Sequence, residues 1–134
     1  MRTFLLLALT FVAVNATQPD LKDLILDNII AAVKHVLCHE DETLNHFVTD
    51  IFQNRKCTDK DICLAEKVMN GLNLKSDPLN LIWRNLYSYA NITKHLHCKV
   101  TAPEQCPVKD FLKKLKDCCQ SLRSKPKLHP KIVK

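Results

Sequence analysis

Glycine is nearly absent from this chain, which contains one glycine and seven cysteines among its 134 residues. Apolar residues recur at helical spacing around the cysteines, a pattern typical of amphipathic helices. We therefore expect the cysteines to join helices to one another rather than to serve as metal ligands in a loop-rich finger. The seven are Cys38, Cys57, Cys63, Cys98, Cys106, Cys118 and Cys119.

Long apolar runs are also scarce, because residues 4–14 form the only extended one. This run follows the positive start Met1-Arg2 and precedes the small residue Ala16, the order typical of a signal peptide. We place the signal peptide at residues 1–16. No later run approaches the roughly 20 apolar residues that a membrane-spanning helix needs. We therefore expect a secreted, extracellular protein in an oxidising compartment, where cysteines pair.

Aromatic residues are few, at 6% of the chain, and the net charge is positive, with 20 Lys and Arg against 14 Asp and Glu. We expect no nucleic-acid partner for a secreted chain of this composition. Two interpretations of the positive charge stay open: a solvated surface, or attraction to an acidic receptor face or to sulphated glycosaminoglycans. After cleavage, the length suits one domain at 17–123 with a basic flexible tail at 124–134, and we expect a monomer.

Four segments have the apolar periodicity of helices packed in a core. The second is preceded by Thr58 and Asp61, spaced like a capping box, and the third opens with Asp77-Pro78, where proline suits the first helical position. The predicted helices span Leu21–Leu37, Ile62–Leu72, Asp77 to about Leu96, and Val108–Leu122.

The predicted connections are unequal in length. About five residues join the second helix to the third, whereas His39–Cys57 and His97–Pro107 are long links. Two long links around a short one are typical of an all-α four-helix bundle with up-up-down-down topology. An odd number of cysteines leaves at least one thiol over, and Cys118 and Cys119 point about 100° apart on a helix. One of these two is the candidate for a buried free thiol.

Four short strings, in order along the chain, carry a resemblance to one family. They are Leu21-Lys22-Asp23-Leu24-Ile25, Val48-Thr49-Asp50-Ile51-Phe52, Arg84-Asn85-Leu86-Tyr87, and Cys106-Pro107-Val108-Lys109 followed by Phe111-Leu112-Lys113-Lys114-Leu115-Lys116. The first is similar to the first helix of interleukin-13, and the others resemble both crossovers and the third and fourth helices of interleukin-4. The chain therefore resembles the interleukin-4/interleukin-13 cytokine family.

The resemblance implies a short-chain four-helix bundle in which Val48–Phe52 and Cys106–Lys109 form a two-strand ribbon. It also implies a Cys63–Cys106 disulfide. The family joins the end of its first helix to a cysteine between helices two and three, but the link Asn73–Asp77 has none, so Cys38 must pair elsewhere or stay free. The implied topology brings Cys57 and Cys98 near the start of the second helix, which makes a Cys57–Cys98 bond plausible, although sequence alone does not fix the pairing.

Receptor contacts follow from the same resemblance. In the family, an acidic residue on the first helix and an arginine on the third anchor the private receptor chain, which assigns these roles to Asp23 and Arg84, with Asn85 beside Arg84. The aromatic that meets the shared second receptor chain falls near Arg123, so the identity of that chain stays open. The alternative is that Asp23 is an ordinary first-turn acid favoured by the helix dipole and that Arg84 is solvated.

The implied function is that of a secreted cytokine without catalytic activity or cofactor. It would dimerise type I cytokine receptor chains, one like interleukin-4 receptor alpha and one like the common gamma chain or interleukin-13 receptor alpha. The outcome would be type-2 immune signalling, with B-cell help and alternative macrophage activation. The alternative is a basic helical antimicrobial protein that binds membranes or lipids through Lys109, Lys113, Lys114 and Lys116.

Two remaining motifs carry weaker signals. His95-Leu96-His97-Cys98 contains zinc-ligand types, but its spacing matches no common zinc site and its cysteine is expected to be oxidised. We therefore predict no metal. Asn91-Ile92-Thr93 is an acceptor sequence for N-linked glycosylation, and Asn91 lies off the predicted core stripe.

Overall fold

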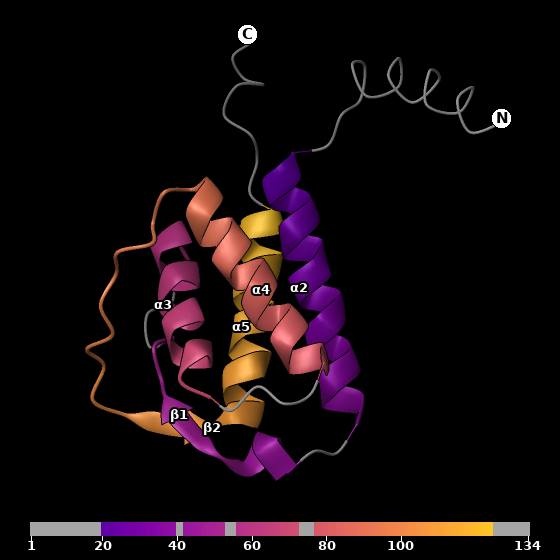
Figure 1. Cartoon of the computed structure of the whole chain (residues 1–134). Helices are drawn as coiled ribbons and strands as arrows, with labels where there is room; N and C mark the ends of the chain where they lie inside the picture. The colour runs from indigo at the N-terminus through magenta and orange to yellow at the C-terminus, as the bar shows by residue number, and fades with distance from the viewer. Residues whose placement is uncertain (1–19, 40–41, 53–55, 73–76, 125–134) are drawn as a thin grey trace, which may run out of the picture.

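The computed structural model describes residues 20–39, 42–52, 56–72 and 77–124. Within them the chain forms a disulfide-stapled helical bundle with one small antiparallel sheet, which confirms that part of the expectation (Figure 1). The helices are α2 (Leu21–Cys38), α3 (Asp59–Asn70), α4 (Asp77–Ile92) and α5 (Val108–Ser124). A 3₁₀ turn, η1 (Glu42–Asn45), and two strands, β1 (Phe47–Thr49) and β2 (Gln105–Pro107), complete the order. The predicted signal peptide, and the predicted tail apart from Ser124, lie outside the described residues.

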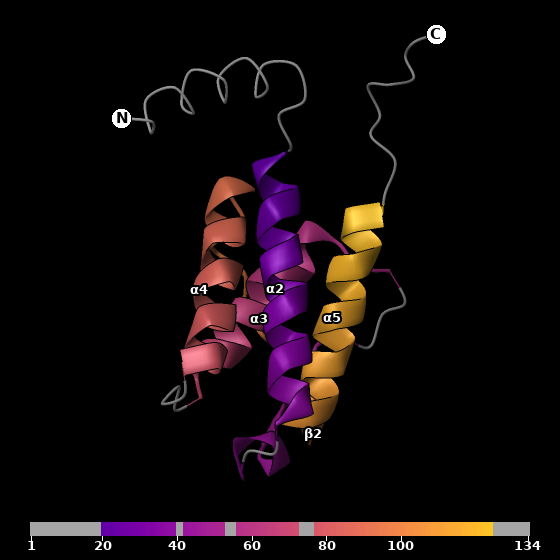
Figure 2. The ribbon, with the colours of Figure 1, turned by 90° about the vertical axis from the view of Figure 1, so that its right-hand side faces the viewer.

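Hydrogen bonds and ion pairs at the two ends of the bundle fix the direction of α5 relative to α2. At one end, the N–H of Val108 donates to the carbonyl of His46, directly after η1, at 2.7 Å. At the other end, the guanidinium of Arg123 lies 3.5 Å from the carboxylate of Asp23. The two helices therefore run in opposite directions. Figures 1 and 2 show α4 running opposite to both α2 and α3, between which it packs.

The apolar stripes of the helices meet in one core. Phe111 of α5 is fully buried there, and its ring lies 5.5 Å from that of Phe52, between centroids. Leu21, the first residue of the first predicted helix, is 57% exposed because it lies in the first turn of α2, at the end of the bundle. The largest fully buried side chains besides Phe111 are Leu26, Ile29, Ile62, Met69, Leu79, Ile82, Leu86, Leu112 and Leu115.

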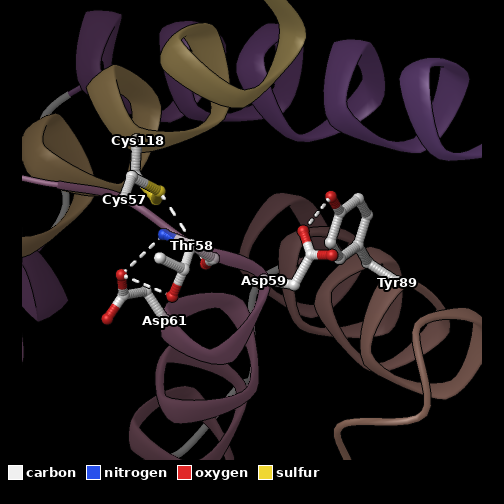
Figure 3. Close-up of a disulfide and its surroundings, with 6 residues drawn as sticks. All are labelled: Cys57, Thr58, Asp59, Asp61, Tyr89 and Cys118. Atoms are coloured by element: carbon white, nitrogen blue, oxygen red, sulfur yellow. Dashed lines mark hydrogen bonds between the residues drawn. A yellow bond between two sulfur atoms is a disulfide. The ribbon is translucent and has the colours of Figure 1, made fainter. Parts of the chain in front are cut away.

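Capping residues set the start of α3. The N–H of Thr58 donates to the carboxylate of Asp61 at 2.8 Å, and the reciprocal bond of the capping box is also present, as predicted (Figure 3). The box places the first helical residue at Asp59, three residues before the predicted start. α3 ends at Asn70, and the N–H of Gly71 closes the last turn on the carbonyl of Val68 at 3.1 Å.

The end of α4 differs from the prediction, which extended it to about Leu96. The helix stops at Ile92, and Lys94 adopts the left-handed conformation, with φ at 61°. The N–H of His95 then donates to the carbonyl of Ala90 at 2.8 Å, and that of Lys94 to Asn91 at 3.2 Å. These two bonds form a Schellman motif, a helix terminus that usually has glycine where this chain has Lys94.

The ribbon is shorter than predicted. β1 pairs antiparallel with β2 over three residues each, with Val48 opposite Cys106. Asp50 still donates its N–H to the carbonyl of Glu104 at 2.8 Å, but its carboxylate accepts from the N–H of Phe52 at 3.2 Å. This local bond turns the chain out of the strand after Thr49.

Both predicted disulfides are wrong in their pairing. Cys63 bonds to Cys98, with 6.2 Å between their Cα atoms, and Cys57 bonds to Cys118, with 5.3 Å. The segment after α4 descends beside α3 before it reaches β2, so Cys98 passes Cys63, whereas Cys106 lies in the ribbon (Figure 1). Cys57, just before the cap of α3, lies against α5 and bonds to Cys118 there (Figure 3).

Three cysteines are free: Cys38, Cys106 and Cys119. The prediction of a buried free thiol among the neighbouring pair is confirmed for Cys119, since its side chain is fully buried and burial raises the pKa of its thiol to about 12. Burial also raises the pKa of the Cys106 thiol. Cys38 is exposed at the end of α2, so it is the accessible thiol of the three.

Candidate functional site

An open apolar groove lies between α2 and α4. It has a volume of about 570 Å³ and is lined by Asn28, Ala31, Ala32, His35, Pro78 and Leu81. The small side chains of Ala31 and Ala32 leave space that larger residues would fill. Leu24 and Leu81 are 45% and 46% exposed beside it, although both are large apolar residues. Exposed apolar surface next to a hollow is typical of a protein-binding site.

We call this surface the α2–α4 face and define it by seven residues: Leu24, Asn28, Ala31 and His35 of α2, and Leu81, Arg84 and Asn85 of α4. On α2 these positions follow the helical spacing of i, i+4, i+7 and i+11, so they share one side of the helix. That side is turned away from the buried stripe of Ile25, Ile29 and Val36. The face is therefore a second stripe of α2, directed to solvent.

Side-chain amides connect the two helices across this face. The Nδ2 of Asn28 donates to the Oδ1 of Asn85 at 3.4 Å, and the Nδ2 of Asn85 donates to the carbonyl of Leu81 at 2.9 Å. Both bonds are exposed to solvent. The pair therefore fixes the amide groups at the edge of the groove while leaving them accessible to a partner.

Arg84 lies next to Asn85 on the exposed side of α4. Its Nε donates to the Oδ1 of Asn80, one turn earlier, at 2.9 Å. Because a guanidinium has five N–H donors, this bond orients the group and occupies only one of them. Arg84 is thus a pre-oriented, exposed cation on α4, one turn after Leu81 of the groove.

An aromatic pair continues the exposed surface on the other side of α4. The rings of Trp83 and Tyr87 lie 5.8 Å apart between centroids, and Tyr87 is 45% exposed. The indole N–H of Trp83 donates to the carboxylate of Glu66 on α3 at 2.8 Å. Glu66 is buried, and its other oxygen lies 3.3 Å from the ammonium of Lys67. This bond holds the indole ring against α3 and supports the position of Tyr87.

Asp23 and Arg123, two of the predicted receptor contacts, lie together at the seam of α2 and α5. The guanidinium of Arg123 is 3.5 Å from Asp23 and donates from its Nε to Asp27 at 3.0 Å. The hydrogen bond to Asp27 raises the pKa of Arg123. Asp23 is 8% exposed, so its carboxylate is largely covered within the bundle.

The structure therefore separates the predicted receptor residues into two groups. Arg84 and Asn85 lie on the α2–α4 face, and Asp23 and Arg123 form an ion pair at another seam. Sequence reasoning missed Leu81 and Ala31. For Ala31 a signal was present, because Leu24, Asn28, Ala31 and His35 repeat at helical spacing along the first predicted helix.

The two weaker motifs have clear positions. Asn91 is exposed in the last turn of α4, and the hydroxyl of Thr93 donates to the carbonyl of Tyr89 at 2.9 Å. Cys98 is bonded to Cys63 and so has no thiolate to offer a metal. Among the residues that the structure describes, no group of three or more His, Cys, Asp or Glu side chains is placed to hold a metal ion.

Among the described residues, no helix combines the length and the apolar content that crossing a membrane requires. Comparisons with protein-family models, with curated proteins and with solved structures found no match to this chain.

Proposed function

We propose that the protein is a secreted interleukin-4/interleukin-13-like cytokine that binds two type I cytokine receptor chains and brings them together. The observation that carries this proposal is the position of Arg84 and Asn85. These two residues belong to one of the strings that resemble the family; Asn85 is bonded to Asn28, which lines the open apolar groove, and Arg84 is exposed one turn after Leu81, another lining residue. Such a ligand signals by proximity of its receptors and needs no chemistry of its own.

The arrangement of the bundle supports the proposal. α2 and α3 run in one direction and α4 and α5 in the other (Figures 1 and 2). The two long links contribute β1 and β2 to the same small sheet. We therefore propose the short-chain, up-up-down-down topology of the family for this chain.

The physics of interfaces also favours this face. Residues that dominate binding energies are enriched in arginine and aromatic residues and lie in apolar surroundings that exclude water. Arg84 fits this description, with Leu81 on one side and Tyr87 on the other. A receptor carboxylate that reaches the Arg84 guanidinium would form a charge-assisted hydrogen bond shielded by the groove.

Asp23 has a different role in this proposal from the one that the resemblance implies. Its carboxylate already faces Arg123, so a receptor cation would have to compete with that pair. We propose that Asp23 orients Arg123, and that Arg123, which is exposed, meets the second receptor chain. The two receptor chains would then contact different sides of α2.

A binding assay tests the proposal. The mature, disulfide-bonded protein is passed over immobilised type I cytokine receptor ectodomains, including chains like interleukin-4 receptor alpha, common gamma and interleukin-13 receptor alpha. We expect binding to at least one chain, and a loss of at least about tenfold with Arg84→Glu. Lys109→Glu, an equal charge reversal at an exposed position of α5, is the matched control and is expected to bind normally. Absence of binding by the natural protein would refute the proposal.

The membrane-binding alternative is tested with the same variants. Lys114 is not available for this role, because its ammonium is bonded to Asp50 at 2.8 Å. Neutralising Lys109, Lys113 and Lys116 should leave receptor binding intact if the protein is a cytokine. If these substitutions abolish activity while Arg84→Glu does not, the alternative is correct.

A further inference from the structure

The segment that links α4 to β2 is rich in basic residues. No acidic residue occurs between Asp77 and Glu104, although the chain has 14 acidic residues in all. The same segment contains Lys94, His95, His97 and Lys99, and all four are exposed. The charged positions of this link are therefore basic as far as its last residue, the exposed Glu104, whereas basic and acidic residues alternate on α5.

α3 lies beside this link. Its lysines are exposed or half-exposed, whereas Asp61 and Glu66 are buried. Asp61 and Glu66 are 8% and 3% exposed, the first in the capping box and the second beneath Trp83. Asp59 accepts a hydrogen bond from the hydroxyl of Tyr89 at 2.6 Å, which together with burial raises the pKa of Tyr89 (Figure 3). Lys60 is exposed and Lys67 half-exposed on the outside of the helix. α3 thus adds cations to the same edge of the molecule.

We call this edge the crossover patch; it consists of Lys60, Lys67, Lys94, His95, His97 and Lys99. The Cys63–Cys98 disulfide fixes the link to α3, and Lys67 and Val100 line the same surface hollow. The link runs beside α3 over most of its length, at the edge of the bundle opposite α2 (Figure 1). The patch is therefore extended, held in place and remote from the α2–α4 face.

Lys94 adds an independent observation. A left-handed conformation is unfavourable for a residue with a side chain, and glycine would avoid that cost. Strain of this kind persists most often at functional positions. Here the residue is the exposed Lys94, at a helix end where glycine usually stands.

We propose that the crossover patch binds the sulphated chain of a glycosaminoglycan, in addition to the receptor binding proposed above. A linear polyanion suits an extended row of cations, and lysine ammonium and imidazole N–H groups donate hydrogen bonds to sulphate oxygens. The two disulfides are typical of an extracellular protein, and sulphated glycans are polyanions of that compartment. The lysines of α5 suit this role less well, since Asp110 and Asp117 are exposed among them.

Heparin binding at 0.15 M salt tests the proposal on the full mature chain. The patch variant is Lys60→Gln/Lys94→Gln/Lys99→Gln, and the control with the same charge change at exposed lysines elsewhere is Lys34→Gln/Lys109→Gln/Lys113→Gln. Each cation that neutralises a polyanion charge contributes roughly fivefold at this salt concentration through counterion release. We expect the patch variant to bind at least about tenfold more weakly than the natural protein and the control to lose less than about threefold.

Further arms identify the ligand class. Desulphated heparin is expected not to bind, and duplex DNA of equal charge and phosphatidylserine vesicles are expected to bind more weakly than heparin. The proposal would be overturned if both triple variants lost heparin affinity equally, or if the natural protein did not bind heparin. It would also be overturned if any of these three ligands bound as tightly as heparin. Receptor binding measured on the same variants is expected to stay unchanged, so failure here and failure of the cytokine proposal are separate results.

Lys94→Gly separates binding from folding. Glycine relieves the left-handed conformation, so the variant should have a higher Tm than the natural protein. It should nevertheless bind heparin severalfold more weakly, because a cation of the patch is lost. Heparin affinity equal to that of the natural protein would contradict a role for Lys94.

Discussion

Replacing Lys114 by methionine removes the cation that neutralises a buried carboxylate. The ammonium of Lys114 lies 2.8 Å from the Oδ2 of Asp50, whose side chain is 12% exposed. The pair joins the segment after β1 to α5, two elements that are far apart in the sequence. Methionine retains the apolar stem of lysine, so the substitution mainly tests the charge.

The expected destabilisation follows from the burial of the two partners. Leaving a buried acceptor without its partner costs about 1–3 kcal/mol, and breaking a fully buried ion pair about 3–5 kcal/mol. Lys114 is 41% exposed, so solvent already screens its charge, and Asp50 keeps the N–H of Phe52 at 3.2 Å. We therefore expect the free energy of unfolding to fall by about 2 kcal/mol, which lies within the range for an unpaired buried acceptor.

Urea and thermal unfolding measure this loss. A loss of about 2 kcal/mol corresponds to a decrease in Tm of about 10 °C for a domain of this size. Lys113→Met, at the exposed neighbouring position of α5, is the control and should stay within about 0.5 kcal/mol of the natural protein. The hydrogen bond to Asp50 raises the pKa of Lys114, so its contribution is present below the unfolded pKa of about 10.4 and is lost as the pH rises through the folded pKa. Equal stabilities of the two variants at neutral pH would refute the reasoning.

Three further predictions concern other parts of the molecule. Lys94→Gly should stabilise the protein by about 0.5–1 kcal/mol in urea unfolding, because Lys94 has φ at 61°; a loss of stability would contradict the Schellman geometry. Iodoacetamide at pH 8 should label only Cys38 in the folded protein and all three free cysteines in denaturant, without reduction; peptide mapping that finds Cys106 in a disulfide would contradict the pairing. Secretion from a eukaryotic cell should add a glycan that Asn91→Gln removes, and a secreted protein without that mass shift would show that the site is not used.

Local signals in the sequence predicted the helices well. The capping box of Thr58 and Asp61 and the proline after Asp77 identified two helix starts, because these signals act within one turn. The end of α4 was missed, since a Schellman terminus normally has glycine and this one has Lys94. The end of β1 was missed as well. The carboxylate of Asp50 accepts a hydrogen bond from the N–H of Phe52 there, but the sequence contains no common turn dipeptide at this point.

Long-range pairings could not be predicted in the same way. The partner of Cys63 depends on the path of the link after α4, and that path places Cys98 rather than Cys106 beside it. The burial of Asp23 likewise depends on where α5 ends, because Arg123, near that end, pairs with Asp23 on the neighbouring helix α2. Arg84 and Asn85 were assigned from the family resemblance, and their positions outside the buried stripe of α4 agree with helical periodicity.

One affinity measurement tests whether the α2–α4 face binds a receptor chain. Leu81→Glu places a charge in the groove, at a position that is 46% exposed and so should not affect folding. Phe47→Glu, at a 62% exposed position of β1, is the control. We predict that the Kd for the receptor ectodomain rises at least about tenfold with Leu81→Glu and stays unchanged with Phe47→Glu. An unchanged Kd with Leu81→Glu would contradict the claim.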